Sequence, residues 1–399
     1  MNYEYLYKIF YKNPSAHKMT YLERFNSPFA KHLDFSIRQF YHQKEFPAFF
    51  CYTEELILLT EKIYKQYEKF LGMINSVPPI ILEQFALSCI VDEVQSSNAI
   101  EGVRSSKKEL SDIVQDISDS PRFYGLVKKY EALRFSKIFQ FKTCEDIRNF
   151  YDDFAHNEIS ANNKLDGKLF RKDSVDVTSF AGKILHRGIY PEEKIIDAMN
   201  YALQFLNAEN IPFLIKVSVF HYLFGYIHPF YDGNGRTSRF ITSYFLTEHF
   251  HYLPALRLSL IIKRQRNKYY DLFSKTTAEI NCGDLTPFIT GFIEIISDVF
   301  TDIEEILNRK MLQLLRCEKI LKSRMPNDEL TQKIYSILLQ TSMFFGRGIS
   351  MDDLINLTGK SRNTIKSRLE SVPNGYIVVT VNKKNFYKLN LTILKIQDR

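Results

Sequence analysis

The chain has 399 residues, of which 45% are hydrophobic and 25% are charged, values that are typical of a globular protein with a sizeable core. Its five cysteines are scattered, odd in number and never form a C-x-x-C pair, which argues against a disulfide framework and against a zinc site. No secretory signal is visible, and no apolar run approaches the roughly 20 residues that span a bilayer. We therefore expect a cytoplasmic protein that does not enter a membrane.

The N-terminal part is expected to be mostly helical. Residues 1–47 are polar and rich in aromatic side chains, and we expect short helices or an irregular arm there. Apolar residues then recur at helical spacing over 52–71, and a second helix is predicted at about 80–93. A further helix at 107–118 completes a predicted N-terminal region, residues 1–118.

A polar segment at residues 96–102 follows the second of these helices. Ser97 and Glu101 are four residues apart and so share one face of a helix, which Gly102 can end. On these residues alone, the simplest interpretation is the polar end of a helix, because short motifs often match by chance.

Two short segments with alternating apolar residues, 175–177 and 184–186, flank a turn that contains Gly182. The pattern predicts a β-hairpin at about 175–186. His186 in its second strand could serve as a catalytic group. A surface or packing role is the simpler interpretation, because a site residue must also have the right geometry.

The segment 228–239, HPFYDGNGRTSR, stands between two predicted helices. The apolar run 211–227 before it predicts a buried helix, and apolar residues over 240–246 recur at helical spacing after it. The segment is therefore a tight loop that leads into the first turn of the second helix. Gly233 and Gly235 permit backbone angles closed to other residues and a close approach of a ligand to the main chain.

The side chains of this loop suit phosphoryl or nucleotidyl transfer. The N-terminal end of the following helix forms an anion site, and Arg236 and Arg239 add positive charge on one of its faces. His228 titrates near neutral pH, as a proton acceptor should. Asp232, beside a phosphate site, suits a hard cation such as Mg²⁺. Phe230 is expected to point into the core.

This segment resembles the signature of the Fic (filamentation induced by cAMP) family, HPFxDGNGRxxR, at every fixed position. The resemblance implies a helical catalytic core over residues 119–315. It also implies a protein adenylyltransferase, which moves AMP from ATP to a Ser, Thr or Tyr hydroxyl of another protein or of itself. His228 would be the base and Asp232 the Mg²⁺ ligand. The residues implied to bind ATP are Gly233, Asn234, Gly235, Arg236, Arg239 and Tyr270.

Two earlier features gain a meaning from this resemblance. Many Fic proteins carry an inhibitory helix with the pattern [ST]xxxE[GN], which Ser97 and Glu101 match. The resemblance pairs Glu101 with Arg239, where its carboxylate would compete with the γ-phosphate of ATP, or orient a water that removes AMP. The hairpin at 175–186 is similar to the family's flap, which aligns a target protein by strand addition.

Residues 256–270 predict one helix with a basic, solvated middle. Tyr270 resembles a family position that helps to hold the nucleotide, and a core tyrosine is the alternative. An apolar helix is predicted at 285–300 and a charged helix at 310–324, with a linker over 316–325.

The last segment, residues 326–399, resembles a winged helix-turn-helix domain, with three helices and a strand-turn-strand wing. From residue 328 onward it has 11 Lys and Arg against 6 Asp and Glu, so that most of the chain's net charge of +7 lies here. Candidate DNA contacts on the third helix are Arg362, Asn363, Lys366 and Arg368. Such domains also serve only for packing or dimerisation, so both roles stay open.

The sequence therefore predicts a mainly α protein with a Fic helical core, a β-hairpin flap, an N-terminal helical region and a small C-terminal winged-helix domain. Adenylylation restrained by Glu101 is the favoured function. Transfer of phosphate or phosphocholine is an alternative within the same fold, and the intact Gly235 and Arg236 argue against the first of these. A DNA-binding regulator whose Fic core senses a nucleotide is the other alternative. Homodimerisation is left open.

Overall fold

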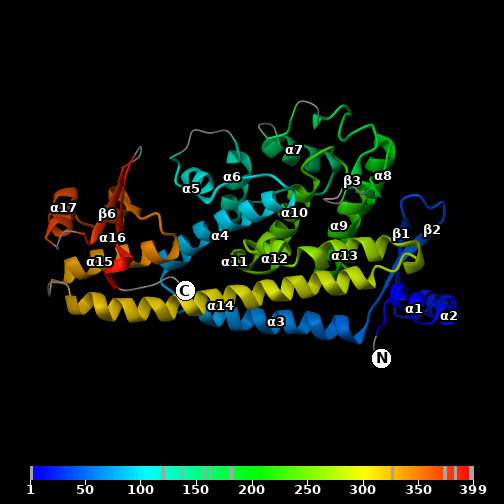
Figure 1. The fold of residues 1–399 in the computed structure, drawn as a ribbon, viewed down its shortest axis with the longest axis horizontal. Helices are drawn as coiled ribbons and strands as arrows, with labels where there is room; N and C mark the ends of the chain where they lie inside the picture. The colour runs from blue at the N-terminus through cyan, green and yellow to red at the C-terminus, as the bar shows by residue number, and fades with distance from the viewer. Residues whose placement is uncertain are drawn as a thin grey trace.

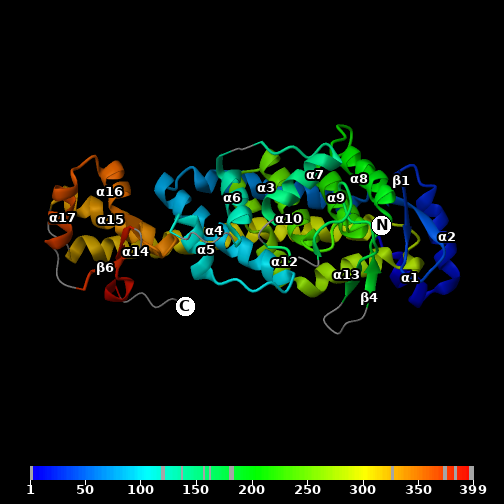
Figure 2. The same cartoon turned by 90° about the horizontal axis from the view of Figure 1, so that it is seen from above.

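The computed structural model describes residues 3–117, 122–135, 138–155, 158–160, 163–178, 184–324, 328–371, 375–381 and 384–394. Within these ranges the protein is mainly helical, as predicted, with three small antiparallel sheets. The molecule is elongated, with the first elements of the chain at one end and the last helices at the other (Figures 1 and 2). None of the helices in these ranges is long and apolar enough to cross a membrane.

The N-terminal elements comprise two short helices and a β-hairpin. They are α1 (Leu6–Lys12), α2 (Pro14–Phe25), β1 (Ala30–Arg38) and β2 (Glu45–Cys51). Short helices or an irregular arm were expected here, and short helices are present. The hairpin was missed, because contacts with distant parts of the chain stabilise it. The backbone N–H of Asp34 donates to the hydroxyl of Tyr201 at 3.0 Å, and that of Arg38 donates to Tyr226 at 2.8 Å.

A helical body follows, built around a buried central pair. Its helices are α3 (Glu54–Ile74), α4 (Pro79–Ile100), α5 (Lys107–Val114), α6 (Tyr124–Ala132), α7 (Cys144–Ala155), α8 (Glu192–Leu206), α9 (Phe213–Ile227) and α10 (Asn234–His249). Thr53 starts α3, because its side chain accepts the N–H of Leu56. Thirteen of the fifteen residues of α9 are buried, so this helix and α10 form the centre of the core. α4 continues to Ile100, seven residues beyond the predicted end at 93, and so includes most of the polar segment.

Two predictions of how the chain divides into helices were wrong. The helix expected at 256–270 is two helices, α12 (Leu258–Arg264) and α13 (Arg266–Thr277), because the helix is interrupted at Gln265. The short helix α11 (Tyr252–Ala255) precedes them. The two helices expected at 285–300 and 310–324 are one helix, α14 (Thr286–Arg324). Ile303 and Leu307 remain buried in the intervening turns, so the apolar stripe is not interrupted.

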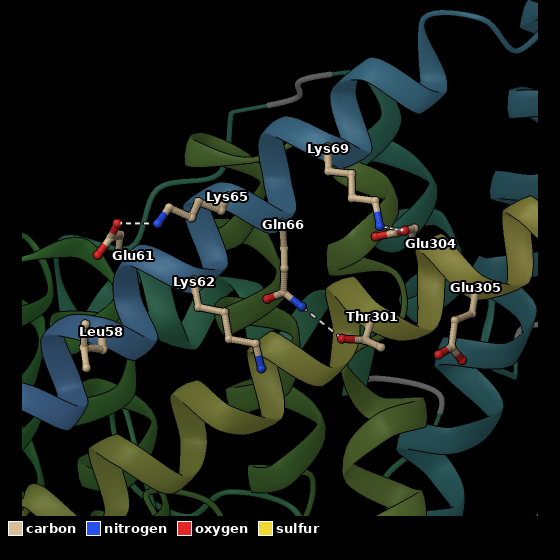
Figure 3. A pocket seen from close by; sticks show the side chains of 9 residues that line it. All are labelled: Leu58, Glu61, Lys62, Lys65, Gln66, Lys69, Thr301, Glu304 and Glu305. Carbon is tan, nitrogen blue, oxygen red and sulfur yellow. Dashed lines mark hydrogen bonds and ion pairs between the residues drawn. The ribbon is translucent and has the colours of Figure 1, made fainter.

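Helices α3 and α14 lie side by side along the molecule (Figure 1). Figure 3 shows the polar face of their contact, where the side chain of Gln66 donates to Thr301 at 2.9 Å. Lys69 forms an ion pair with Glu304 across the same boundary. The charged side chains here belong to solvated faces of two packed helices.

The C-terminal elements form a small unit with three helices and a three-stranded sheet. They are α15 (Glu329–Phe344), β5 (Ile349–Ser350), α16 (Met351–Thr358), α17 (Arg362–Glu370), β6 (Ile377–Val381) and β7 (Asn385–Leu389), with strand order β5-β7-β6. The three helices and the β6–β7 pair were predicted, whereas β5 was missed. The winged-helix assignment stays a prediction, and the wing's turn at 382–383 lies outside the described residues.

The C-terminal unit packs against helices of the body. Residues 316–324, which were assigned to a linker, are the last turns of α14, and Cys317 and Leu321 are buried there. Phe344 of α15 meets Phe85 of α4 edge to face, and Arg347 pairs with Asp112 of α5. The division of the chain into domains at 1–118, 119–315 and 326–399 stays a prediction.

Candidate functional site

The predicted loop between two helices is present: α9 ends at Ile227 and α10 begins at Asn234. His228 follows α9 with a left-handed backbone (φ 53°, ψ 61°), and its N–H donates to the carbonyl of Phe224 at 2.9 Å. Gly233 precedes α10 with φ 80°, a conformation that favours glycine. The chain therefore reverses sharply, and the positive end of α10 faces the loop.

Two side chains fix the shape of the loop from within. Phe230 is fully buried and stacks on Tyr151 with ring centroids 3.7 Å apart, so the prediction that it points into the core is correct. Asn234 accepts the N–H of Phe230 at 2.9 Å and donates to its carbonyl at 2.7 Å. The side chain of Asn234, predicted to bind phosphate, thus closes the loop.

The imidazole of His228 has a defined state. Its Nδ1 lies 3.3 Å from the carbonyl of Gly225, and because a carbonyl can only accept, Nδ1 carries the hydrogen and Nε2 keeps its lone pair. Burial, with the neighbouring His186 second, lowers the pKa of His228 to about 3. The ring is therefore neutral at physiological pH and can accept a proton at Nε2.

His228 opens into a cavity of about 540 Å³ between the end of α4, the flap strands β3 (Asp176–Thr178) and β4 (Ile184–Arg187), α9, α10 and α13. These strands pair antiparallel where the hairpin was predicted, and Gly182 lies outside the described residues. Predicted site residues that line the cavity are Glu101, His228, Asn234, Gly235, Arg239 and Tyr270. Asp232, Gly233 and Arg236 are not among its described lining residues.

Glu101 and Arg239 form an ion pair at the wall of this cavity, with Oε1 2.9 Å from Nη1. Arg239 also donates from Nε to the hydroxyl of Ser97 at 3.1 Å and from Nη2 to the Ser97 carbonyl at 2.9 Å. A Cβ at Gly235 would lie 2.0 Å from Glu101 Oε1, so the carboxylate rests directly on the loop. Ser97 and Glu101, at the end of α4, thus bind the guanidinium of Arg239, and Glu101 also fills the space beside Gly235.

The two remaining charged residues of the loop lie next to one another. Asp232 accepts the N–H of Gly233 at 2.5 Å and lies 3.6 Å from Arg236, and its side chain is about one-third exposed (35%). An exposed carboxylate oxygen at the positive end of a helix fits Mg²⁺ that takes its other ligands from phosphates and water. Arg236 is buried in an ion pair with Glu158, which is itself buried. Burial raises the pKa of Glu158 to about 7, and Arg236 opposes this effect.

Residues 143–246 match the model of the Fic/DOC family. The chain contains a Fic domain. The protein adenylyltransferase Fic of Drosophila erecta is 42% identical over 89 residues, which are 22% of this chain and 16% of that protein. That of Drosophila melanogaster is 40% identical over 89 residues, with the same shares of the two chains. The chain thus spans 16% of the length of these curated relatives.

Among solved structures, a Fic family protein from Desulfovibrio desulfuricans G20 matches 86% of this chain and 97% of its own, with a TM-score of 0.52 and 18% identity. At this identity the likeness concerns the fold alone. It extends beyond the Fic domain, because the matched share of the chain is larger than residues 143–246.

Two aromatic neighbours of the Fic domain's cavity have different roles. Tyr269 also lines the cavity, but its side chain is buried and its hydroxyl bonds to His221 at 2.7 Å, so it packs as a core residue. Tyr270 lines the cavity and donates to the carbonyl of Ile100 at 3.4 Å. The predicted contact of Tyr270 with a nucleotide is compatible with this position and stays a prediction. His186 donates from Nε2 to the carbonyl of Tyr226 at 2.6 Å and so packs the flap against α9.

Two charged residues near the Fic domain's loop were missed from the sequence, Glu158 and Arg171. Glu158 belongs to a polar stretch without periodicity, and only the fold places it on Arg236. Arg171 follows the same stretch and donates from Nε to the carbonyl of His228 at 2.9 Å. Neither stands at a spacing that links it to the signature.

The residues predicted to contact DNA are largely engaged by acidic neighbours. Arg362 lies 2.8 Å from Asp352, and Arg368 lies 3.5 Å from Asp328. Lys366 lies 3.8 Å from Glu370 on the same helix, whereas Asn363 is exposed. These carboxylates offset the positive charge that phosphates would meet, so DNA binding stays a prediction.

Proposed function

We propose that the protein is an adenylyltransferase that moves AMP from ATP to a Ser, Thr or Tyr hydroxyl of a protein, itself included. The observation that carries the proposal is the neutral His228, whose Nε2 keeps its lone pair beside a cavity that Gly235 and Arg239 also line. The partial relatives in Drosophila are named protein adenylyltransferases. A base and an anion site in one cavity are what this transfer requires.

In the proposed reaction, His228 accepts the proton of the target hydroxyl at Nε2. The hydroxyl oxygen then forms a bond to the α-phosphorus, the bond from that phosphorus to the bridging oxygen breaks, and pyrophosphate leaves. The first N–H groups of α10, next to Gly235, and the guanidinium of Arg239 bind the phosphate oxygens in positions fixed before the reaction. Asp232 would hold Mg²⁺, which when bound neutralises part of the phosphate charge.

We further propose that Glu101 restrains this activity. Its carboxylate pairs with Arg239 at 2.9 Å, and a triphosphate would need the same guanidinium. The carboxylate also rests beside Gly235, where it would repel a phosphate placed at the start of α10. Removal of AMP by a water that Glu101 orients is a second reaction compatible with this position.

The test is incorporation of label from α-³²P-ATP with Mg²⁺ into the full chain and into added protein. Glu101→Gly should raise incorporation well above the parent chain, and His228→Ala in the Glu101→Gly chain should abolish it. Glu68→Gln, on the exposed face of α3, is the matched control and should leave the parent level unchanged. Equal labelling of parent, Glu101→Gly and the double variant would refute the proposal.

A parallel reaction with γ-³²P-ATP separates the alternatives within the fold, since only phosphate transfer would leave that label on protein. Intact mass measurement of the Glu101→Gly chain identifies the group that is added. The cytoplasmic location stays a prediction, and homodimerisation stays open.

A further inference from the structure

Arg171 is fully buried and uses its guanidinium in an unusual way. Its side chain donates to main-chain carbonyls: to His228 at 2.9 Å, to Ile189 at 2.8 Å and to Asp173. Within the described residues, no carboxylate forms an ion pair with it, although buried guanidinium groups usually have such a partner. Burial lowers its pKa to about 10, so the group stays charged at neutral pH.

The carbonyls that Arg171 binds flank the proposed base on both sides. Its Nη2 reaches the carbonyl of Ile227 at 3.4 Å, its Nε reaches that of His228, and its own N–H donates to Pro229 at 3.2 Å. Carbonyls at the end of a helix lack partners within the helix and carry its negative dipole. A buried cation therefore stabilises the end of α9 where the chain turns into the left-handed backbone of His228.

The same side chain contacts the end of the flap. Ile189, whose carbonyl it binds, and Gly188 follow β4 directly. A Cβ at Gly188 would lie 2.3 Å from Nη2 of Arg171, so the chain passes against the guanidinium with no room for a side chain. Arg171 is thus a direct connection between the base of the flap and the loop that carries His228.

We propose that Arg171 is a positioning residue of the Fic domain, which fixes the backbone of His228 and joins it to the base of the flap. This inference rests on the proposed function for its effect on transfer, and on the structure alone for its effect on His228. Lysine cannot replace it, because an ammonium group does not reach carbonyls of 189, 227 and 228 together.

The activity test uses the full chain in the Glu101→Gly background. Arg171→Lys should lower the rate of labelling from α-³²P-ATP about 100-fold. A catalytic base that is displaced by about 1 Å causes a loss of this size. Binding of a fluorescent ATP analogue should change less than about twofold, because Arg171 does not line the cavity. Added guanidinium ion should partly restore the rate of Arg171→Ala.

Arg257→Lys is the matched control, because Arg257 is also buried but pairs with Asp302 on α14. It should leave the labelling rate within about threefold of that of the Glu101→Gly chain, because a substitution at a distant, independent site has only a small effect on this rate. A rate for Arg171→Lys equal to the control, or no rescue of Arg171→Ala by guanidinium, would overturn the proposal.

A second measurement does not depend on catalysis. In protein with ¹⁵N-labelled histidine, the His228 ring should show the neutral Nδ1–H form in the parent chain at pH 7. Arg171→Lys should shift its resonances, whereas Arg257→Lys should not. If Glu101→Gly fails to label any protein, the proposed function fails and these spectra still decide the role of Arg171. Unchanged His228 resonances in Arg171→Lys would then overturn it.

Discussion

The carboxylate of Glu101 lies 2.9 Å from the guanidinium of Arg239, although the two residues come from separate helices that are far apart in the chain. The contact joins the end of α4 to α10 at the wall of the cavity. A single oxygen, Oε1 of Glu101, also lies 2.0 Å from where a Cβ at position 235 would stand. The absence of a side chain at Gly235 is therefore a condition for the ion pair.

Gly235→Ala should destabilise the protein, and the cost should depend on Glu101. The added methyl group would overlap Oε1 of Glu101 and approach Nη1 of Arg239 at 2.7 Å, and overpacking of this kind costs about 1–3 kcal/mol. In the Glu101→Gly chain the first overlap is gone, so the cost should fall. Urea unfolding of the four chains of this double-mutant cycle measures the difference. An equal cost in both backgrounds would contradict the contact.

Ser97→Ala should release the restraint only in part. The change removes the bond from Arg239 Nε to the hydroxyl at 3.1 Å but keeps the bond to the Ser97 carbonyl and the ion pair with Glu101. A lost hydrogen bond of about 1 kcal/mol corresponds to a rise in labelling of roughly fivefold. Ser76→Ala, at the exposed end of α3, is the control. Labelling as strong as that of Glu101→Gly would contradict a shared restraint.

The rate of transfer should not fall at the usual titration point of histidine. Burial and His186 lower the pKa of His228 from 6.5 to about 3, so the neutral, accepting form persists far below pH 6.5. In the Glu101→Gly chain, the labelling rate should stay level from pH 8 to about pH 5. A rate that halves near pH 6.5 would show that the ring is not buried in this way.

The same shift affects stability in a defined direction. The unfolded chain binds a proton at His228 near pH 6.5, whereas the native chain does not until about pH 3. Its contribution to the free energy of unfolding is therefore complete above pH 6.5 and decreases as the pH falls toward 3. Urea unfolding between pH 7 and pH 5 should show a smaller loss for His228→Gln than for the parent chain.

Phe230→Ala should destabilise the chain by about 3–5 kcal/mol, as loss of a fully buried aromatic ring does. The ring of Phe230 stacks on Tyr151 at 3.7 Å and meets Phe170 at 5.7 Å, so its removal leaves a cavity beneath the loop. Chemical denaturation measures the change. A cost below about 1 kcal/mol would show that the loop is shaped without this anchor.

The cost of Glu158→Gln should depend on pH. Burial raises the pKa of Glu158 from 4.5 to about 7, so the carboxylate is charged and paired with Arg236 at pH 8 but largely protonated at pH 6. Between these values the folded chain binds a proton at Glu158 that the unfolded chain does not, so this group makes the parent chain more stable at pH 6 than at pH 8. Glutamine does not titrate, so the substitution should cost more at pH 6 than at pH 8. Unfolding of both chains at the two pH values tests this, and an equal cost would place the pKa well below 6.

The sequence predicted the elements that are determined locally. Gly233 and the apolar residues on either side of the loop are sufficient to predict a sharp turn between two buried helices, and this turn is present. Contact between Glu101 and Arg239 came from the resemblance, because spacing along the chain carries no information on two side chains so far apart. The ion pair itself is present in the structure.

Elements that depend on distant contacts could not be predicted in this way. The β1–β2 hairpin has its backbone bonded to tyrosines on α8 and α9, and the connection between its strands, residues 39–44, contains no Gly, Pro, Asn or Asp. Arg171 and Glu158 lie beside the loop only because the polar stretch around them folds back over α9 and α10. From the sequence alone, a charged residue in an irregular stretch is expected to be exposed to solvent, because its partner in the fold is not known.

Helix α14 has a mechanical consequence. Its 39 residues form one rod of about 58 Å, at about 1.5 Å per residue, which contacts α9 and α13 near the cavity and α15 at the opposite end. A tilt of the rod by roughly 5° would displace its far end by about 5 Å. Among the described residues, α15 and α13 both pack on this one helix, so a displacement of α15 that tilts α14 would also move the helix that carries Tyr270.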